Sequence, residues 1–166
     1  MSSEEPDLQP PVLIRPYVDA DAAATLAVFI AAVTQTAAAH YSPKQLQAWA
    51  RPDVRDRGEW NRARRALNTF VAVVADSVVG FSDVATDGYI DMLFVDPSHG
   101  GRGIGMRLLD EAERQAREAG APGLSADVSI TAHPVFERAG FVVEQTQHPV
   151  LAGVALTNFK MRKTLG

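Results

Sequence analysis

The chain has 166 residues, of which 46% are hydrophobic and 22% are charged, and it carries a formal net charge of −4 at pH 7. This length and balance predict one domain with a sizeable core, and the negative charge argues against a surface for nucleic acid or anionic membranes. The absence of cysteine excludes disulfides, thiolate metal sites and a cysteine nucleophile.

The chain begins with an acidic, proline-containing segment, which predicts a flexible leader over residues 1–10 and a domain over residues 11–166. The leader lacks the basic and apolar regions of a signal peptide. The longest mostly apolar run, residues 22–33, is too short to span a bilayer. We therefore expect a cytoplasmic protein that binds neither membranes nor nucleic acid.

The first elements of the domain are a strand and a helix. Residues 12–18 are β-branched and apolar enough for a strand, and Asp19 or Asp21 offers a cap for a helix that runs to about residue 36.

Two shorter helices are predicted next. Ser42 stands before a proline and marks the start of a helix that ends near Trp49, and a further helical stretch covers residues 54–67. Six arginines between residues 51 and 65 give this region a local basic cluster, which we interpret as a solvated helix face.

Strands dominate the middle of the chain. The Val-rich residues 69–75 and 78–85 predict a hairpin with Asp76 and Ser77 as its turn. Residues 89–95 form a near-continuous apolar run, which is typical of a strand in the centre of a sheet.

Helices and strands alternate in the last part of the chain. An apolar stripe at helical spacing ends at Gly120 and consists of Ile104, Leu108, Leu109, Ala112 and Ala116. Strand 123–129, helix 132–140 and the closing strands 141–147 and 154–163 follow. Because hairpins and a helical crossover coexist, we expect an α/β (α+β) domain whose mixed, mostly antiparallel sheet has about seven strands. The apolar closing strands offer a homodimer edge.

A glycine cluster precedes the striped helix, in the stretch "VDPSHGGRGIGMRLL". Gly101, Gly103 and Gly105 match the opening of a dinucleotide fingerprint, but its third glycine would fall at Leu108, and the Lys-Ser/Thr pair of a P-loop is missing. A nucleotide-binding Rossmann protein is therefore a weak alternative. Taken alone, the cluster fits a phosphate cradle and a plain strand-to-helix turn equally well.

Two motifs in the right order resemble the GCN5-related N-acetyltransferase (GNAT) family. "MLFVDPSHGGRGIGMRLL" is similar to its strand, V-x-P turn and pyrophosphate loop, and "ADVSITAHPVFERAGF" is similar to its later cofactor segment. The likeness covers residues 13–163 and is greatest to the bacterial YafP-like branch, on "AAVTQTAAAHYSPKQLQAWA", "YIDMLFVDP", "SITAHPVFERAGF" and "LTNFKMRK".

The resemblance implies a single GNAT domain with acetyl-CoA in a V-shaped gap between the fourth and fifth strands. Backbone amides of residues 101–106 would hold the pyrophosphate, and the main chain of residues 93–95 would pair with the pantetheine arm. The implied cofactor residues are Leu93, Phe94, Val95, Gly100, Gly101, Arg102, Gly103, Ile104, Gly105, Met106, Ser129 and Phe136.

Two positions depart from the family pattern. The Gln or Arg that opens the family's loop is Gly100 here, which weakens the cofactor grip without abolishing it, because much of that grip comes from main-chain amides. The tyrosine proposed in the family to protonate the CoA thiolate corresponds to Phe136, which has no proton to give. Ser129, Tyr41, Tyr89 and a water are the candidate replacements.

An acceptor amine is mostly protonated at neutral pH and must lose a proton before it attacks a carbonyl. Asp91 is the candidate base because it interrupts an otherwise apolar strand, where regular alternation would put it on one face with Tyr89 and Leu93. A carboxylate held in a structural hydrogen bond explains the same position equally well.

His40, Tyr41 and Trp49 lie in the region that forms one wall of the acceptor site in this family, and they suit a small aromatic or amine acceptor. Taken singly, Trp49 also fits a core residue and His40 a helix-end cation. The other histidines lack paired ligand spacing, so we expect no metal.

The expected reaction is direct acetyl transfer from acetyl-CoA to the amine of a small molecule, with strand amides of residues 92–94 stabilising the oxyanion. The alternative is a non-catalytic domain of the same fold that senses CoA or binds a partner.

Overall fold

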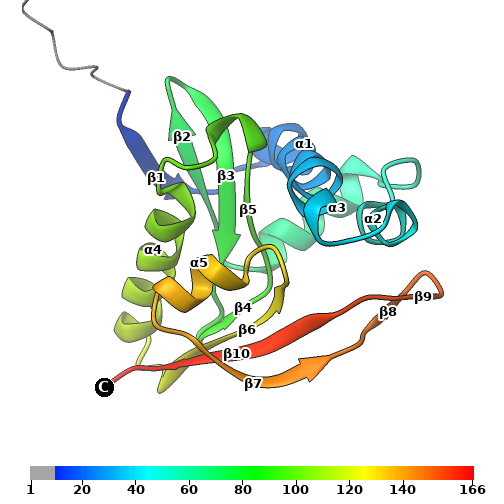
Figure 1. The fold of residues 1–166 in the computed structure, drawn as a ribbon. Coiled ribbons are helices and arrows are strands. Elements are labelled where there is room, and N and C mark those ends of the chain that lie inside the picture. The colour runs from blue at the N-terminus through cyan, green and yellow to red at the C-terminus, as the bar shows by residue number, and fades with distance from the viewer. Residues whose placement is uncertain (1–9) are drawn as a thin grey trace, which may run out of the picture.

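The computed structural model describes residues 10–166, so the expected leader falls, except for Pro10, outside the described residues and stays a prediction. The chain folds into two four-stranded sheets and a small hairpin, flanked by helices (Figure 1). This architecture confirms the expected mixed, mostly antiparallel α/β class.

The first sheet is antiparallel throughout, in the order β1-β2-β3-β5. Its strands are β1 (Val12–Pro16), β2 (Thr69–Val74), β3 (Ser77–Asp83) and β5 (Leu93–Val95). The hairpin turn comes one residue earlier than expected, at Ala75 and Asp76, because both adopt the positive φ that a two-residue type I′ turn requires.

The second sheet has the order β4-β6-β10-β7. Its strands are β4 (Tyr89–Ile90), β6 (Gly123–Ser129), β10 (Asn158–Thr164) and β7 (Val142–Gln147). The strands β8 (Val150–Leu151) and β9 (Val154–Ala155) form a separate hairpin. The last strand lies between β6 and β7, so the expectation that the closing strands form an edge holds for β7 alone.

The expectation of one continuous central strand over residues 89–95 is wrong. The segment breaks at Asp91 and Met92 into β4 and β5, and each half is the edge strand of a different sheet. The two sheets therefore join at this break, with the apolar halves of the segment on either side of it.

Both faces of the first sheet are covered by helices. On one face α4 (Ile104–Glu118) packs against β1, β2, β3 and β5 with the predicted stripe, whose five residues are all buried. The helix stops before Gly120, which has φ +79°, as expected. On the other face α1 (Ala22–Ala31) packs against β3, β5 and α3 (Arg57–Ala66), while α2 (Pro43–Ala50) lies beside the continuation of α1 and against β9. The short helix α5 (His133–Arg138) packs against α4 and β6.

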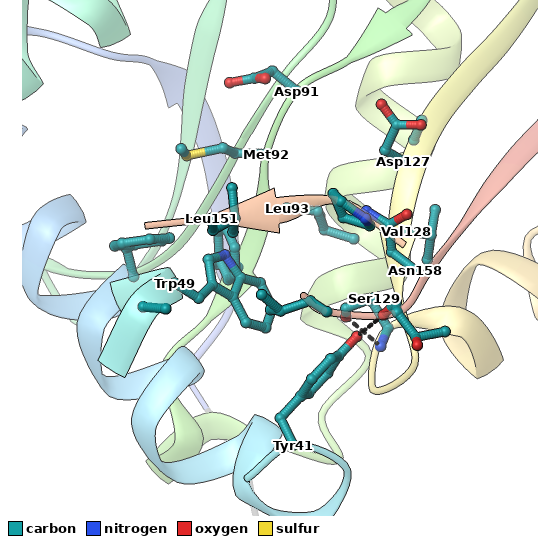
Figure 2. A pocket seen from close by; sticks show the side chains of 18 of the residues that line it. Tyr41, Trp49, Asp91, Met92, Leu93, Asp127, Val128, Ser129, Leu151 and Asn158 are labelled. Carbon is teal, nitrogen blue, oxygen red and sulfur yellow. Dashed lines mark hydrogen bonds between the residues drawn. The ribbon is translucent and has the colours of Figure 1, made fainter. Parts of the chain in front are cut away.

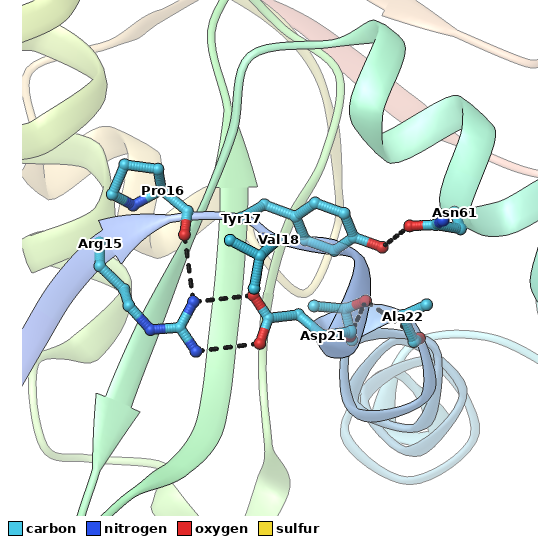
Figure 3. A network of polar contacts seen from close by, with 8 residues as sticks. Arg15, Pro16, Tyr17, Val18, Asp21, Ala22 and Asn61 are labelled. Carbon is cyan, nitrogen blue, oxygen red and sulfur yellow. Dashed lines mark hydrogen bonds and ion pairs between the residues drawn. The ribbon is translucent and has the colours of Figure 1, made fainter.

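The entry into α1 is fixed by a polar network at the end of β1 (Figure 3). Asp21 accepts the Val18 N–H at 2.9 Å and a bidentate pair of bonds from Arg15 at 2.8 and 2.9 Å. Burial raises the pKa of Asp21, but the combined effect of these donors is larger and lowers it, so the pKa lies below its ordinary value. Nearby, Tyr17 donates to Asn61 of α3 at 2.7 Å. The carboxylate thus caps the start of the helical segment by bonding back toward the strand.

The expected end of the first helix near residue 36 is confirmed, but residues 32–36 are π-helical, and a 3₁₀ turn at residues 37–39 extends the helical run slightly further. The whole run, Asp19–Ala39, is long and apolar enough by composition to cross a membrane. Its Val28, Phe29 and Val33 are buried in the second core cluster, with Trp60 and Phe81. One face of the run is therefore packed into the core of the domain.

Candidate functional site

An opening in the fold lies where β5 separates from β6. β4 pairs with β6 in parallel at Tyr89 and Ile90, but β5 pairs only with β3. A cavity of about 370 Å³ lies in this gap, lined by β5, the end of β6, α2 and the β8–β9 hairpin (Figure 2). Its volume is at the lower end of the range that small-molecule sites occupy. This gap corresponds to the one expected between the fourth and fifth strands.

The separation of the strands has a visible cause in Asp83, at the end of β3. Its carboxylate accepts the backbone N–H groups of Asp91 at 2.7 Å and of Met92 at 3.1 Å. Both amides are thereby taken out of the sheet, and the strand bends at this point. Asp83 is 2% exposed, and burial, the largest cause, raises its pKa to about 6.

Arg64 of α3 compensates the charge of these carboxylates. It is 4% exposed, stacks 4.8 Å over the Trp60 ring, and places its Nη atoms 3.7 Å from Asp83 and 3.6 Å from Asp91. The interpretation of the arginine cluster as a solvated helix face is therefore wrong for Arg64. It is also wrong for Arg55, which is half-buried, whereas Arg51, Arg57, Arg62 and Arg65 are exposed.

Asp91 lines the cavity, and its side chain is 39% exposed (Figure 2). The regular alternation expected to group it with Tyr89 and Leu93 fails because the strand is broken there. Tyr89 lies outside the cavity lining and its hydroxyl donates to Asp127 at 3.1 Å. Burial and the charge of Asp127 raise the pKa of Tyr89 to about 12, and its proton is held by Asp127 outside the cavity.

The acceptor-wall candidates divide into two kinds. Tyr41 and Trp49 line the cavity with their rings 5.5 Å apart in an edge-to-face arrangement. The Tyr41 hydroxyl donates to the Thr157 carbonyl and accepts the Ile130 N–H at 2.9 Å, and burial raises its pKa. His40 is exposed, bonds to Thr131 at 2.9 Å and lies outside the cavity lining.

Ser129 and Phe136 close the cavity near α5. Ser129 accepts the Ala132 N–H at 3.0 Å, so its own proton is uncommitted among the described residues. Phe136 is 3% exposed and packs edge-on against Phe141 at 5.0 Å. The wall at this position is therefore apolar and supplies no acid.

The glycine loop presents a row of open backbone donors. Gly101 and Gly103 have φ near +76° and +75°, and a Cβ added at either would meet nothing within 4 Å. No backbone N–H of residues 101–106 donates to an acceptor in the described part of the chain, and α4 has no side-chain cap. Arg102 is exposed on the loop, and Gly100 has an ordinary φ of −63°. Gly105 lets α4 approach Val135 of α5.

The edge of β5 that faces the gap also carries free amides. Asp96 N–H donates to Val79 across the ladder, and hydrogen-bonded pairs alternate in an antiparallel sheet. The next bonded pair is therefore Phe94 with Phe81, which leaves Leu93 and Val95 turned toward the gap. Amides 92–94 were expected to stabilise the oxyanion together. The Met92 amide is bound by Asp83 and that of Phe94 pairs with Phe81, so only the Leu93 amide is left for this role.

Several cavity residues escape the sequence analysis. Asp127 is one of them, and the only signal in the sequence was a carboxylate in an apolar strand. The hairpin residues had no motif, because their role depends on the chain returning over the gap. The additional lining residues include Phe29, Arg51, Arg55, Asp127, Leu151, Leu156 and Asn158. Within residues 10–166 no group of three or more potential metal-ligating side chains occurs, so the absence of a metal stays a prediction.

Comparison with known proteins gives consistent relatives. A family model described as an acetyltransferase (GNAT) domain matches residues 37–165. The chain is 40% identical to YafP, an uncharacterized N-acetyltransferase of Escherichia coli K12, over 91% of this chain and 95% of YafP. A GCN5-related N-acetyltransferase structure from Rhodopseudomonas palustris has a TM-score of 0.89 at 34% identity, covering 95% of this chain and 98% of that one. The PaiA N-acetyltransferase of Thermoplasma acidophilum, solved with coenzyme A, has a TM-score of 0.74 at 21% identity over 93% and 99%.

Proposed function

The chain belongs to the GNAT family of acetyltransferases, as a YafP-like member, and on this premise we propose that it transfers acetyl from acetyl-CoA directly to a small-molecule amine. The observation that carries the proposal is the gap itself. A free strand edge on β5 leads to an uncapped helix N-terminus with open glycines, and this arrangement fits an extended ligand that ends in a diphosphate.

The residues present fit the CoA portion in two places. The amides of residues 101–106 would hold the pyrophosphate, since their donors are free and a glycine leaves room for close approach. The main chain of Leu93 and Val95 would pair with the pantetheine arm. CoA supplies the activated acetyl thioester, and the CoA complex of PaiA, which shares this fold, supports the assignment.

The chemistry is assigned to three groups around the cavity. Asp91 takes a proton from the acceptor ammonium, so that the neutral amine attacks the thioester carbonyl. The Leu93 N–H polarises that carbonyl and stabilises its negative charge. The nitrogen of the tetrahedral adduct loses its second proton to solvent, and the carbon–sulfur bond breaks. The thiolate takes a proton from the Tyr41 hydroxyl, which solvent reprotonates, and Asp91 returns its proton to solvent.

Tyr41 is preferred to Ser129 as the donor because a phenol is a far stronger acid than an alcohol. Its hydroxyl is protonated at neutral pH, and it donates to the thiolate by exchanging its hydrogen bond to the Thr157 carbonyl. Tyr41→Phe should lower kcat about 100-fold with little change in CoA affinity. Full activity in this variant would show that Ser129 or water, and not Tyr41, protonates the thiolate.

Turnover tests the proposed function directly. The purified chain is mixed with acetyl-CoA and a panel of small amines, and free thiol is measured while calorimetry follows CoA binding. Acetyl-dependent thiol release with at least one amine supports transfer. CoA binding without turnover across a broad panel favours the non-catalytic alternative, and binding of NAD without CoA would favour a Rossmann-type site.

We further propose that the enzyme works in the cytoplasm, which is consistent with the packing of its apolar helix inside the domain. We also propose that two copies associate through β7, whose Val142 and Val143 are exposed. Sedimentation measures the oligomeric state and tests this.

A further inference from the structure

The α2 end of the cavity carries positive charge from Arg51 and Arg55. Arg51 is the C-cap of α2 and adopts a left-handed conformation with φ 45°, which sets its side chain at the cavity rim. Arg55 is fixed by two hydrogen bonds of 2.9 Å, from Nε to the Ala50 carbonyl and from Nη2 to the Trp49 carbonyl.

These bonds use two of the five N–H groups of the Arg55 guanidinium. The other three donate to no acceptor among residues 10–166, and neither Arg51 nor Arg55 has a carboxylate within 4.0 Å in that range. The Arg55 guanidinium also lies 4.8 Å from the Phe29 ring centroid, on the apolar floor of the cavity. It is therefore a rigid, half-buried cation with donors to spare.

Arg55 forms no ion pair with any carboxylate of residues 10–166. Burial, followed by the neighbouring charges of Arg51 and Arg64, lowers its pKa. The two carboxylates that line the cavity, Asp91 and Asp127, come from the strands and lie at the side away from Tyr41 (Figure 2). The cavity thus has an acidic side, suited to an amine, and a basic end with an unmatched charge.

We propose that the acetyl acceptor is an aminocarboxylate, an amino acid or a related molecule, whose carboxylate binds Arg55 and Arg51. Its amine reaches Asp91, and its apolar body lies against Trp49 and Phe94, whose ring centroids are 6.1 Å apart. A carboxylate matches the planar fork of a guanidinium and forms charge-assisted hydrogen bonds to it. This inference rests on the proposed function, because it names the substrate class of the same site.

The test first measures binding without turnover. The CoA-saturated enzyme is titrated by calorimetry with 3-phenylpropionate and with 3-phenylpropanamide, which have the same shape but differ in charge. The anion should bind at least about tenfold more tightly, and its advantage should shrink as salt is added. Equal binding of the two probes, or binding of neither, overturns the proposal.

Variants then show which arginine binds the carboxylate of the probe. Arg55→Gln should remove most of the preference for the anion, whereas Arg57→Gln, an exposed arginine outside the cavity, should leave it intact. Because Arg55 also binds the end of α2, Arg51→Gln is a second variant that leaves those bonds in place and should reduce the preference severalfold. Unchanged preference in both cavity variants contradicts the assignment.

A turnover arm separates this inference from the proposed function. Phenylalanine and phenethylamine share an amine and an aromatic body, and they differ in the carboxylate. A higher kcat/KM for phenylalanine that Arg55→Gln abolishes supports the inference. Equal turnover of both amines overturns the inference alone, while failure to bind CoA overturns the proposed function.

Discussion

Asp91 is the residue on which the proposed chemistry depends most. It reaches the cavity because the strand bends there, and its only ion-pair partner in the described chain is Arg64, at 3.6 Å. That distance is too long for a direct hydrogen bond, so the carboxylate keeps lone pairs for an acceptor amine.

Asp91→Asn keeps the shape of the side chain but removes the base. We expect kcat to fall about 100-fold, because a positioned general base contributes about that much, while the Kd for CoA stays within about twofold. Steady-state kinetics and calorimetry measure the two quantities. Asp110→Asn, on an exposed position of α4, controls for the loss of a negative charge. Unchanged turnover in Asp91→Asn would remove this residue from the mechanism.

Asp83 gives a prediction about stability. Its pKa is raised from 3.8 to about 6, so the folded state holds the proton more tightly than the unfolded chain does. The stabilising contribution of this group is therefore complete at pH values below 3.8 and is lost as the pH rises through about 6. A pKa difference of this size corresponds to about 3 kcal/mol.

Urea unfolding between pH 4 and pH 7 measures this contribution when wild type is compared with Asp83→Asn, which does not titrate. The difference in unfolding free energy between the two proteins should change by about 2 kcal/mol over this range, because the contribution is not yet complete at pH 4. A constant difference would show that Asp83 titrates normally in the folded protein.

At the scale of elements, the glycine loop and α4 form one unit. The helix was predictable because its apolar stripe repeats at helical spacing and Gly120 ends it, and all five stripe residues are buried. The break in the segment 89–95 was not predictable, because it depends on Asp83, a residue of the neighbouring strand whose carboxylate binds two amides there. Local apolar character alone indicates an unbroken strand.

Gly101→Ala tests whether the loop is a binding element. The φ of +76° makes alanine strained there by about 1 kcal/mol, and its methyl group would enter the space that the proposed pyrophosphate occupies. We expect the Kd for CoA to rise at least about tenfold. Gly120→Ala is a matched control with φ +79° and an equally open position at the far end of α4. Equal CoA affinity in the two variants would assign the glycines to the turn alone.

At the scale of the whole molecule, two sheets meet at one bent segment (Figure 1), and the lining residues place the cavity at their junction. The family motifs in the sequence were sufficient to predict the fold class and the position of the gap. The charge of its far wall was not predictable, because Arg55 reads locally as part of a basic helix face. Its role follows from α2 and β5 packing around the same space.

The position of the hairpin 149–156 depends on tertiary packing in the same way. Gln45 of α2 donates to the Ala155 carbonyl at 3.1 Å, and Leu156 is 5% exposed in the second core. These contacts connect residues more than a hundred positions apart, so no local pattern predicts that the hairpin closes the cavity.

The most direct test of the central claim is a crystal structure of the protein with acetyl-CoA. The account predicts a pyrophosphate on the amides of residues 101–106, a pantetheine arm paired with Leu93 and Val95, and a thioester carbonyl within hydrogen-bond distance of the Leu93 N–H. Acetyl-CoA bound away from the gap between β5 and β6, or a gap closed by strand pairing, would contradict it.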